Sequence, residues 1–185
     1  MKKLVLLFAV FALVTTIACN KEDEPEEEAK IGSIELSYME GGSDKSFSIE
    51  GEYNYDAISN KSGVSTKAMV GSSDMYINGI HFNSSTNIDQ IEMTFNKNIK
   101  KGDEIEVVET SLGLLNPKIE WSTGIEKAVE GLYMSFDYEL SAGSKINVIE
   151  YKEGEYIKCI ITGRGKDKNT DAILSVLSGN FKVYF

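Results

Sequence analysis

Several residue types on which common chemistries depend are scarce in this chain of 185 residues. It contains one histidine, one tryptophan, two cysteines and two prolines, and Arg164 is its single arginine. Neither Gly-x-Ser-x-Gly nor His-Glu-x-x-His occurs, so the sequence shows no recognisable nucleophile or zinc-protease motif. Planar, bidentate binding of phosphate depends on arginine, so a phosphate site built from several arginines is excluded.

Basic residues are outnumbered, since 19 lysines and arginines face 29 acidic residues and the formal net charge at pH 7 is −10. Nucleic-acid binding needs clustered lysine and arginine to neutralise phosphates. We therefore expect no nucleic-acid partner.

Long apolar runs are missing except for one, which extends from Leu4 to Ala18 behind Met1-Lys2-Lys3. A membrane-spanning helix needs about 20 apolar residues, and this run is shorter. Its basic start, apolar middle and small residues at the end are typical of a cleaved secretory signal. We expect residues 1–18 to be a signal peptide. The signal could be cleaved together with lipid attachment or without it.

The end of this run, Thr16-Ile17-Ala18-Cys19, resembles the lipobox of bacterial lipoproteins, although leucine is commonest where Thr16 stands. The resemblance implies cleavage before Cys19, a diacylglycerol on its thiol and usually an acyl chain on its amine. Two or more buried chains anchor a protein stably, at ~0.8 kcal/mol per buried methylene. We therefore expect the membrane to be a partner through acyl chains on Cys19.

Six acidic residues crowd around Pro25 directly after this cysteine. Like charges repel and nothing here is apolar, so residues 19–30 are expected to form a disordered acidic linker. The segment Lys21-Glu22-Asp23-Glu24 also resembles the surface-export signal of Bacteroidota lipoproteins. That resemblance implies a position on the bacterial outer membrane, facing outside. A plain spacer is the alternative.

From residue 31 to residue 185, apolar and polar side chains alternate in segment after segment, as in half-buried antiparallel strands. The clearest segments are 34–38, 47–55, 91–95, 119–121, 134–140, 146–148 and 181–185. Only 107–115 has room for a turn or two of helix. We therefore predict a single all-β domain over 31–185, a mostly antiparallel β-sandwich or small barrel of about ten strands.

Turn residues separate these segments, and Asn78-Gly79 within 75–82 predicts a two-residue hairpin turn. Four short motifs resemble small uncharacterised lipoprotein domains of Bacteroidota over about residues 70–185. They are Ile77-Asn78-Gly79, Ile99-Lys100-Lys101-Gly102-Asp103, Ile161-Thr162-Gly163 and Ser178-Gly179-Asn180-Phe181. The resemblance implies no activity.

Cys159 is the one cysteine left once Cys19 carries lipid, so no intramolecular disulfide is expected. It alternates with Ile157 and Ile161, which predicts a buried structural thiol. A catalytic thiol is the alternative, and it would need an electropositive, partly exposed setting.

Three further segments bear on chemistry. His81, beside the predicted hairpin turn, has the groups for acid–base work or metal binding. Asp167-Lys168-Asn169-Thr170-Asp171 resembles the first half of a calcium loop, with a polar hairpin loop as the alternative. Gly163-Arg164-Gly165-Lys166 is basic, but it leads into a loop rather than a helix N-terminus. We assign no catalytic residue, metal or cofactor from these patterns.

Aromatic residues give the remaining candidates for ligand binding. Tyr53 and Tyr55 share a face in the predicted strand, beside Asn54 and Asp56, and Trp121 is the single tryptophan. Exposed rings flanked by such polar groups suit a sugar, whereas ordinary core packing is the alternative.

We therefore expect a non-catalytic binding or accessory lipoprotein whose ligand is a glycan, a small molecule or a protein. A hydrolase with a site on the loops and a purely structural envelope protein are the alternatives.

Overall fold

A computed structural model describes residues 29–60, 62–83, 87–126 and 136–185. The segment 1–18 that is expected to be a signal peptide, Cys19, and the segment from Lys21 through Glu22 and Asp23 to Glu24 lie outside the described residues. The described elements, in chain order, are β1 (Gly32–Glu40), β2 (Ser43–Gly51), α2 (Tyr55–Asn60), β3 (Gly63–Val70), β4 (Asp74–Phe82), β5 (Asn87–Asn96), β6 (Glu104–Glu106), β7 (Val108–Glu109), β8 (Leu115–Asn116), β9 (Lys118–Glu126), β10 (Tyr138–Leu140), β11 (Lys145–Lys152), β12 (Tyr156–Asp167) and β13 (Ile173–Tyr184). The all-β prediction is confirmed, with one short helix among these elements.

Eleven of the strands form one sheet in which every pairing is antiparallel. Its order is β2-β1-β13-β12-β10-β9-β5-β4-β3, and β11 pairs with both β12 and β6. The two remaining strands, β7 and β8, pair only with each other.

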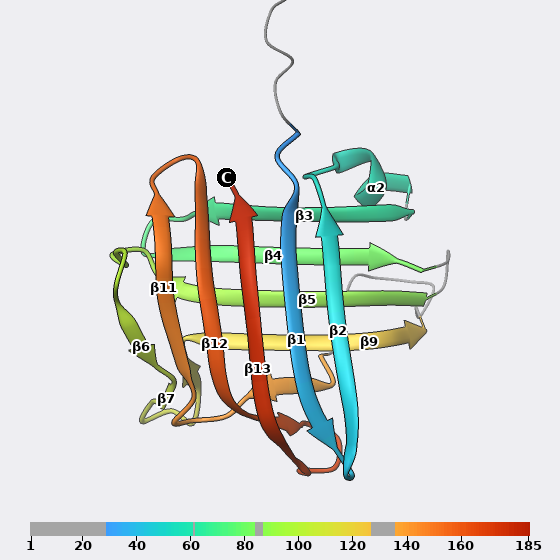
Figure 1. Cartoon of the computed structure of the whole chain (residues 1–185), viewed down its shortest axis with the longest axis vertical. Helices are drawn as coiled ribbons and strands as arrows, with labels where there is room; N and C mark the ends of the chain where they lie inside the picture. Colours follow the sequence, from blue (N-terminus) through green and yellow to red (C-terminus); the bar gives the residue numbers. More distant parts are fainter. Residues whose placement is uncertain (1–28, 61, 84–86, 127–135) are drawn as a thin grey trace, which may run out of the picture.

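This sheet folds over on itself into two layers (Figure 1). β11, β12, β13, β1 and β2 form the front layer, and β3, β4, β5 and β9 run crosswise behind them. β12 joins the layers, because Gly165 to Asp167 pair with β10, which in turn pairs with β9. The β12–β13 ladder shifts register between Gly163 and Gly165. Such a bulge bends a strand, and here it lies where the sheet turns the corner.

The core lies between the two layers and is built from the inward residues of each strand. Fully buried members include Ile34, Leu36 and Ile49 from the front and Met75, Ile77, Met93 and Phe95 from the back. Cys159 is 0 % exposed, which confirms its prediction as a buried thiol. Burial also raises the pKa of this thiol to about 12.

The predicted hairpin at Asn78-Gly79 is wrong, because both residues lie inside the continuous strand β4. β4 pairs with β3 on one side and β5 on the other, with Gly79 opposite Thr66 and Ile91. A Cβ on Gly79 would lie 2.9 Å from Ile34 Cδ1, on the front layer. The glycine therefore allows the layers to approach each other and does not form a turn.

Two other local predictions are also corrected. The strand predicted over 47–55 ends at Gly51, and the chain then enters α2, where the Ala57 N–H donates to Asn54 Oδ1 at 3.0 Å. That bond makes Asn54 an N-cap, a role that competes with extended structure. Within 107–115 the structure has β7 and the start of β8 rather than helical turns. Residues 163–166 lie near the end of β12 and lead into the loop between β12 and β13, as predicted.

Within the described ranges, none of the helical segments has the length and apolar content needed to cross a membrane.

Candidate functional site

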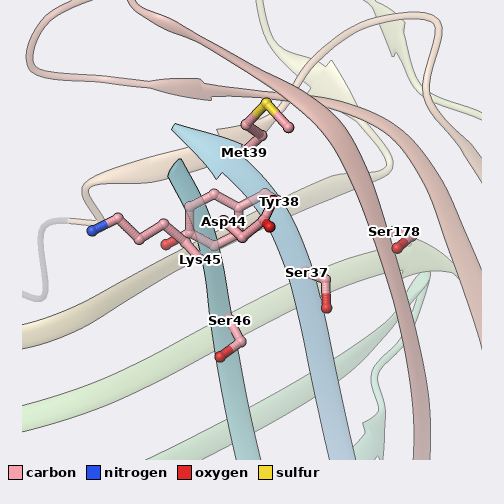
Figure 2. A pocket seen from close by; sticks show the side chains of 7 residues that line it. All are labelled: Ser37, Tyr38, Met39, Asp44, Lys45, Ser46 and Ser178. Atoms are coloured by element: carbon pink, nitrogen blue, oxygen red, sulfur yellow. The ribbon is translucent and has the colours of Figure 1, made fainter. Parts of the chain in front are cut away.

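A row of serines crosses three neighbouring strands on the outer face of the front layer. Ser46 of β2 and Ser178 of β13 both pair with Ser37 of β1, which lies between them. All three are exposed and alternate with inward residues such as Leu36 and Phe47. Figure 2 shows the three side chains on adjacent strands. Because they are small, they leave a hollow of about 400 Å³, which we term the serine hollow.

Larger residues complete the lining of this hollow. Met39 and Asp44 lie at the turn end of β1 and β2, and Tyr38 and Lys45 complete the set (Figure 2). Tyr38 is only 4 % exposed and belongs to the core, whereas Asp44 and Lys45 are exposed. The lining therefore combines hydroxyl donors and acceptors with one carboxylate and one ammonium group.

The polar character continues beyond the hollow along the same face. Thr162 of β12 is paired with Ser178 and is also exposed, so hydroxyl groups extend over four strands. In the adjacent row, Asn180 Nδ2 donates to Glu35 Oε2 at 3.0 Å. This face offers many hydrogen-bonding groups and few that transfer protons at neutral pH.

Two tyrosines lie farther along this face, in the row that pairs the first residue of β12 with the last residue of β13. The ring centroids of Tyr156 and Tyr184 are 5.7 Å apart, and Lys182 Nζ lies 4.8 and 5.0 Å from them. The Tyr156 hydroxyl donates to Glu150 Oε2 at 2.7 Å. That hydrogen bond lowers the pKa of Glu150 and raises the pKa of Tyr156. Sequence reasoning missed this cluster, although both tyrosines occupy outward positions of recognisable alternating strands.

The predicted ligand-binding role of Trp121 is contradicted, because its side chain is 0 % exposed. Its ring stacks on Tyr138 at 5.6 Å and meets Tyr38 edge-on at 5.8 Å. A Cβ on Gly165 would lie 2.9 Å from Trp121 Cη2, so the indole fills the corner where the sheet turns. The large ring is used for core packing at the junction of the layers.

Tyr53 and Tyr55 remain exposed, by 47 % and 67 %. They do not share a strand face as predicted, since Tyr53 lies between β2 and α2 and Tyr55 begins α2. Lys67 Nζ lies 4.0 Å from the Tyr53 ring centroid, so a cation already covers one face of that ring. With Trp121 in the core, the three predicted aromatics form no common platform.

His81 lies near the end of β4, and the predicted turn at Asn78-Gly79 does not lie beside it, because both of those residues are within the strand. Its Nδ1 is 3.9 Å from Asp89 Oδ2. Asp89 also accepts a hydrogen bond from Asn83 Nδ2 at 2.7 Å and one from the Gly124 N–H at 2.8 Å. Asp89 therefore ties together neighbouring backbone segments as well as facing the imidazole.

The loop between β12 and β13 uses its carboxylates internally. Asp167 Oδ1 accepts the N–H groups of Asn169 and Thr170 at 2.7 and 3.2 Å. Hydrogen bonds from Thr170 and from the Asn169 backbone lower the pKa of Asp167. Asp171 Oδ1 is 2.7 Å from Lys166 Nζ. This geometry is that of a polar turn, and the described residues contain no group of three or more side chains arranged to hold a metal.

No protein-family model, curated protein or solved structure gives a significant match to this chain.

Proposed function

We propose that this chain is a lipid-anchored protein of the bacterial outer membrane, facing outside, that binds a short glycan without catalysing a reaction. The signal-like residues 1–18 and Cys19 support the anchor, and Lys21-Glu22-Asp23-Glu24 supports the outward address. The serine hollow supports the class of ligand.

One observation carries the choice of ligand, namely the row of hydroxyl groups in register across adjacent strands. A hydroxyl both donates and accepts, so Ser37, Ser46 and Ser178 match the hydroxyl groups of a sugar ring in either role. Asp44 adds a strong acceptor at the rim. Each such bond contributes only about 0.5–1.5 kcal/mol net of lost water contacts, so we expect weak and selective binding.

Catalysis is not favoured by the same geometry. The hollow is lined by neither histidine nor cysteine, and Asp44 is its single carboxylate. Glycoside hydrolysis normally uses two carboxyl groups flanking the scissile bond.

The test is a glycan array probed with the lipid-free domain, followed by calorimetric titration with the best glycan. Ser37→Trp fills the centre of the hollow, and we expect the affinity to fall at least about tenfold, which corresponds to about 1.4 kcal/mol. Ser33→Trp is the matched control, because Ser33 lies on the same face of β1 but outside the hollow. If no glycan binds, the proposed ligand is wrong. If both variants lose affinity equally, the serine hollow is not the binding site.

The anchor is tested separately by metabolic labelling with palmitate. The natural chain should incorporate label at Cys19, and Cys19→Ser should incorporate none. A membrane-bound chain with an unmodified, different N-terminus would contradict the proposed anchor.

The address is tested by adding protease to intact cells. The natural chain should be digested, and replacement of Glu22, Asp23 and Glu24 by alanine should protect it. Equal digestion of both forms would show that the acidic residues act only as a spacer.

A further inference from the structure

The single arginine of the chain lies beside the serine hollow, on the same outer face of the sheet. Arg164 follows Thr162 by two positions in β12, and Thr162 is paired with Ser178, which lines the hollow. Both Arg164 and Thr162 are exposed, whereas Ile161 and Gly165 are buried. Residues two positions apart on one strand are about 6.5 Å apart, and neighbouring strands are about 4.8 Å apart. The long side chain of Arg164 therefore brings its guanidinium group within reach of the hollow.

A β-bulge holds the backbone of Arg164 in one position. The ladder between β12 and β13 shifts register between Gly163 and Gly165, on either side of this arginine. Buried Ser144 Oγ donates to the Arg164 carbonyl and accepts from the Arg164 N–H, at 3.1 Å in both cases, and a Cβ on Gly163 would collide with it. The Ser141 N–H also donates to the Arg164 carbonyl, at 2.9 Å. Bulges commonly set the direction of a side chain beside a site, and a fixed backbone lowers the entropy cost of binding.

The guanidinium group of Arg164 makes no ion pair within the described part of the chain, although the chain carries 29 acidic residues. Two neighbouring lysines are already paired. Lys145 Nζ of β11 is 2.6 Å from Glu104 Oε1, and Lys166 Nζ of β12 is 2.7 Å from Asp171 Oδ1. Arg164 therefore keeps its side-chain hydrogen-bond donors available for a ligand.

Three carboxylates near this part of β12 act on Lys166. Glu139 lies opposite Lys166 in the ladder between β10 and β12. The pKa of Lys166 is raised chiefly by its hydrogen bond to Asp171, and also by the charges of Glu139 and Glu109. These carboxylates are therefore grouped around the lysine and not around the arginine.

The two ends of the serine hollow differ in charge. On β2, Asp44 and Lys45 both line the hollow, so their charges nearly cancel. Glu40, at the same turn, accepts a hydrogen bond from the Tyr138 hydroxyl at 3.3 Å. β1 and β13 lie between β2 and β12, so three strand spacings place Arg164 about 14 Å from the β2 end. A glycan that crosses the row of serines therefore meets an unpaired positive charge at the β12 end.

Given the glycan binding proposed above, we propose that the glycan is acidic and that Arg164 binds its carboxylate or sulfate group. A guanidinium group presents two parallel N–H donors that match two oxygens of either anion, and such charge-assisted hydrogen bonds are stronger than neutral ones. A chain of net charge −10 repels acidic glycans in general. Only a glycan whose acidic group reaches Arg164 recovers this cost, so the arginine determines specificity.

The first test sorts the bound glycans by charge. Residues 19–185 with Cys19→Ser are applied to an array of uronate-containing, sulfated and neutral oligosaccharides. We expect binding to acidic oligosaccharides, and the uronate and sulfate arms distinguish the two anions. Binding to neutral oligosaccharides alone would overturn the acidic ligand and leave the proposed glycan binding intact. Binding to none would overturn both.

The second test removes the charge of the arginine. The best acidic oligosaccharide and its neutral counterpart, made by methyl-esterification or desulfation, are titrated calorimetrically. Arg164→Gln should weaken binding of the acidic form at least about tenfold and of the neutral form by less than about twofold. Arg164→Lys should keep part of the affinity, because an ammonium group retains the charge but lacks the two parallel donors.

Lys158→Gln is the matched control, because Lys158 is exposed on the same face of β12, about 20 Å away along the strand. It removes the same charge, and it should change the affinity by less than about twofold. Equal losses in Arg164→Gln and Lys158→Gln, or equal losses for the acidic and neutral forms, would overturn the role of Arg164. If Ser37→Trp abolishes binding and Arg164→Gln changes nothing, the serine hollow is the site and the acidic ligand is wrong.

Discussion

Replacing Gly79 with alanine tests why a glycine occupies the centre of β4. The added methyl would lie 2.9 Å from Ile34 Cδ1, 3.1 Å from Ile91 Cγ2 and 3.4 Å from Ile49 Cδ1. Overpacking of this kind costs about 1–3 kcal/mol. Gly79 does not have a positive φ, so alanine adopts its backbone without strain and recovers about 0.4–1 kcal/mol of chain entropy. We expect a net loss of about 0.5–2 kcal/mol in the free energy of unfolding.

A second substitution identifies the atoms responsible. Ile34→Val removes the Cδ1 atom nearest to the new methyl and costs about 0.5–1.5 kcal/mol by itself. The double variant should lose less stability than the sum of the two single losses, by about 0.5–1 kcal/mol, because removal of Cδ1 relieves the clash. Ile146→Val is the matched control, since Ile146 is also 0 % exposed in the front layer and makes no close approach to the Gly79 position. Its loss should add to that of Gly79→Ala.

Urea denaturation of the natural domain, the three single variants and the two double variants measures these free energies at constant m-value. If the loss of Gly79→Ala adds to that of Ile34→Val as fully as to that of Ile146→Val, contact between Gly79 and Ile34 is not the reason for the glycine. A large loss in Asn78→Ala would refute it too, since that result would indicate a turn at Asn78-Gly79.

Further predictions concern the buried thiol, the carboxyl group hydrogen-bonded to a tyrosine and the single histidine. With a pKa of about 12, Cys159 should be a thiolate in about one molecule in ten thousand at pH 8. A disulfide reagent should therefore react with it only as fast as the domain unfolds, which is measured as the absorbance of the released product at increasing urea concentrations. Rapid reaction of the native domain would contradict the burial of this thiol. The pKa of Glu150 is lower in the folded domain than in the unfolded chain, where it is near 4.5. The ionised carboxylate therefore stabilises the fold at pH values above 4.5, and this contribution is lost as the pH falls through the folded pKa. The stability difference between the natural domain and Tyr156→Phe should therefore be present at pH 6 and shrink below pH 4.5, as thermal melts against pH would show; a constant difference would exclude this bond. His81→Ala should change stability by about 1 kcal/mol or less, because the imidazole is 37 % exposed and 3.9 Å from Asp89. A hydrolase and esterase panel run on both forms would support an enzyme instead if an activity of the natural domain disappeared.

Alternation along single strands was the part of the fold that sequence could predict. The inward positions of β1, β12 and β13 follow it, as Ile34, Cys159 and Phe181 show. Period-two burial is a local property of an extended chain beside a core, so it appears in one sequence without knowledge of the partner strand. The N-cap role of Asn54 is not recognisable from the sequence, because an extended strand and a helix start can both place a short polar residue between aromatic ones.

The role of Gly79 could not be predicted in this way. Asn-Gly is typical of a tight turn, but glycine is also needed where two layers of a sandwich are in close contact. The second role depends on the isoleucines that lie against Gly79 in the fold, and these are distant in the sequence. Trp121 posed the same problem, because its burial depends on the corner formed by Gly165, far away in sequence.

The serine hollow was also beyond sequence reasoning, for a different reason. Ser37 and Ser178 are neighbours only because β1 pairs with β13 in one particular register. Each serine taken alone is an ordinary outward residue. The site arises from the registers of three strands, and long-range register is not encoded in any local pattern.

The position of β1 determines how the domain responds to mechanical tension. β1 lies between β2 and β13, and its first residue follows the N-terminal segment. A pull through that segment along the strand axis therefore loads two ladders of hydrogen bonds in shear, and many bonds must break together before the strand slides. A pull across the strand would instead open the bonds one pair at a time. Under force, lifetime is set by the unfolding rate, so the direction of the pull decides how long the fold survives.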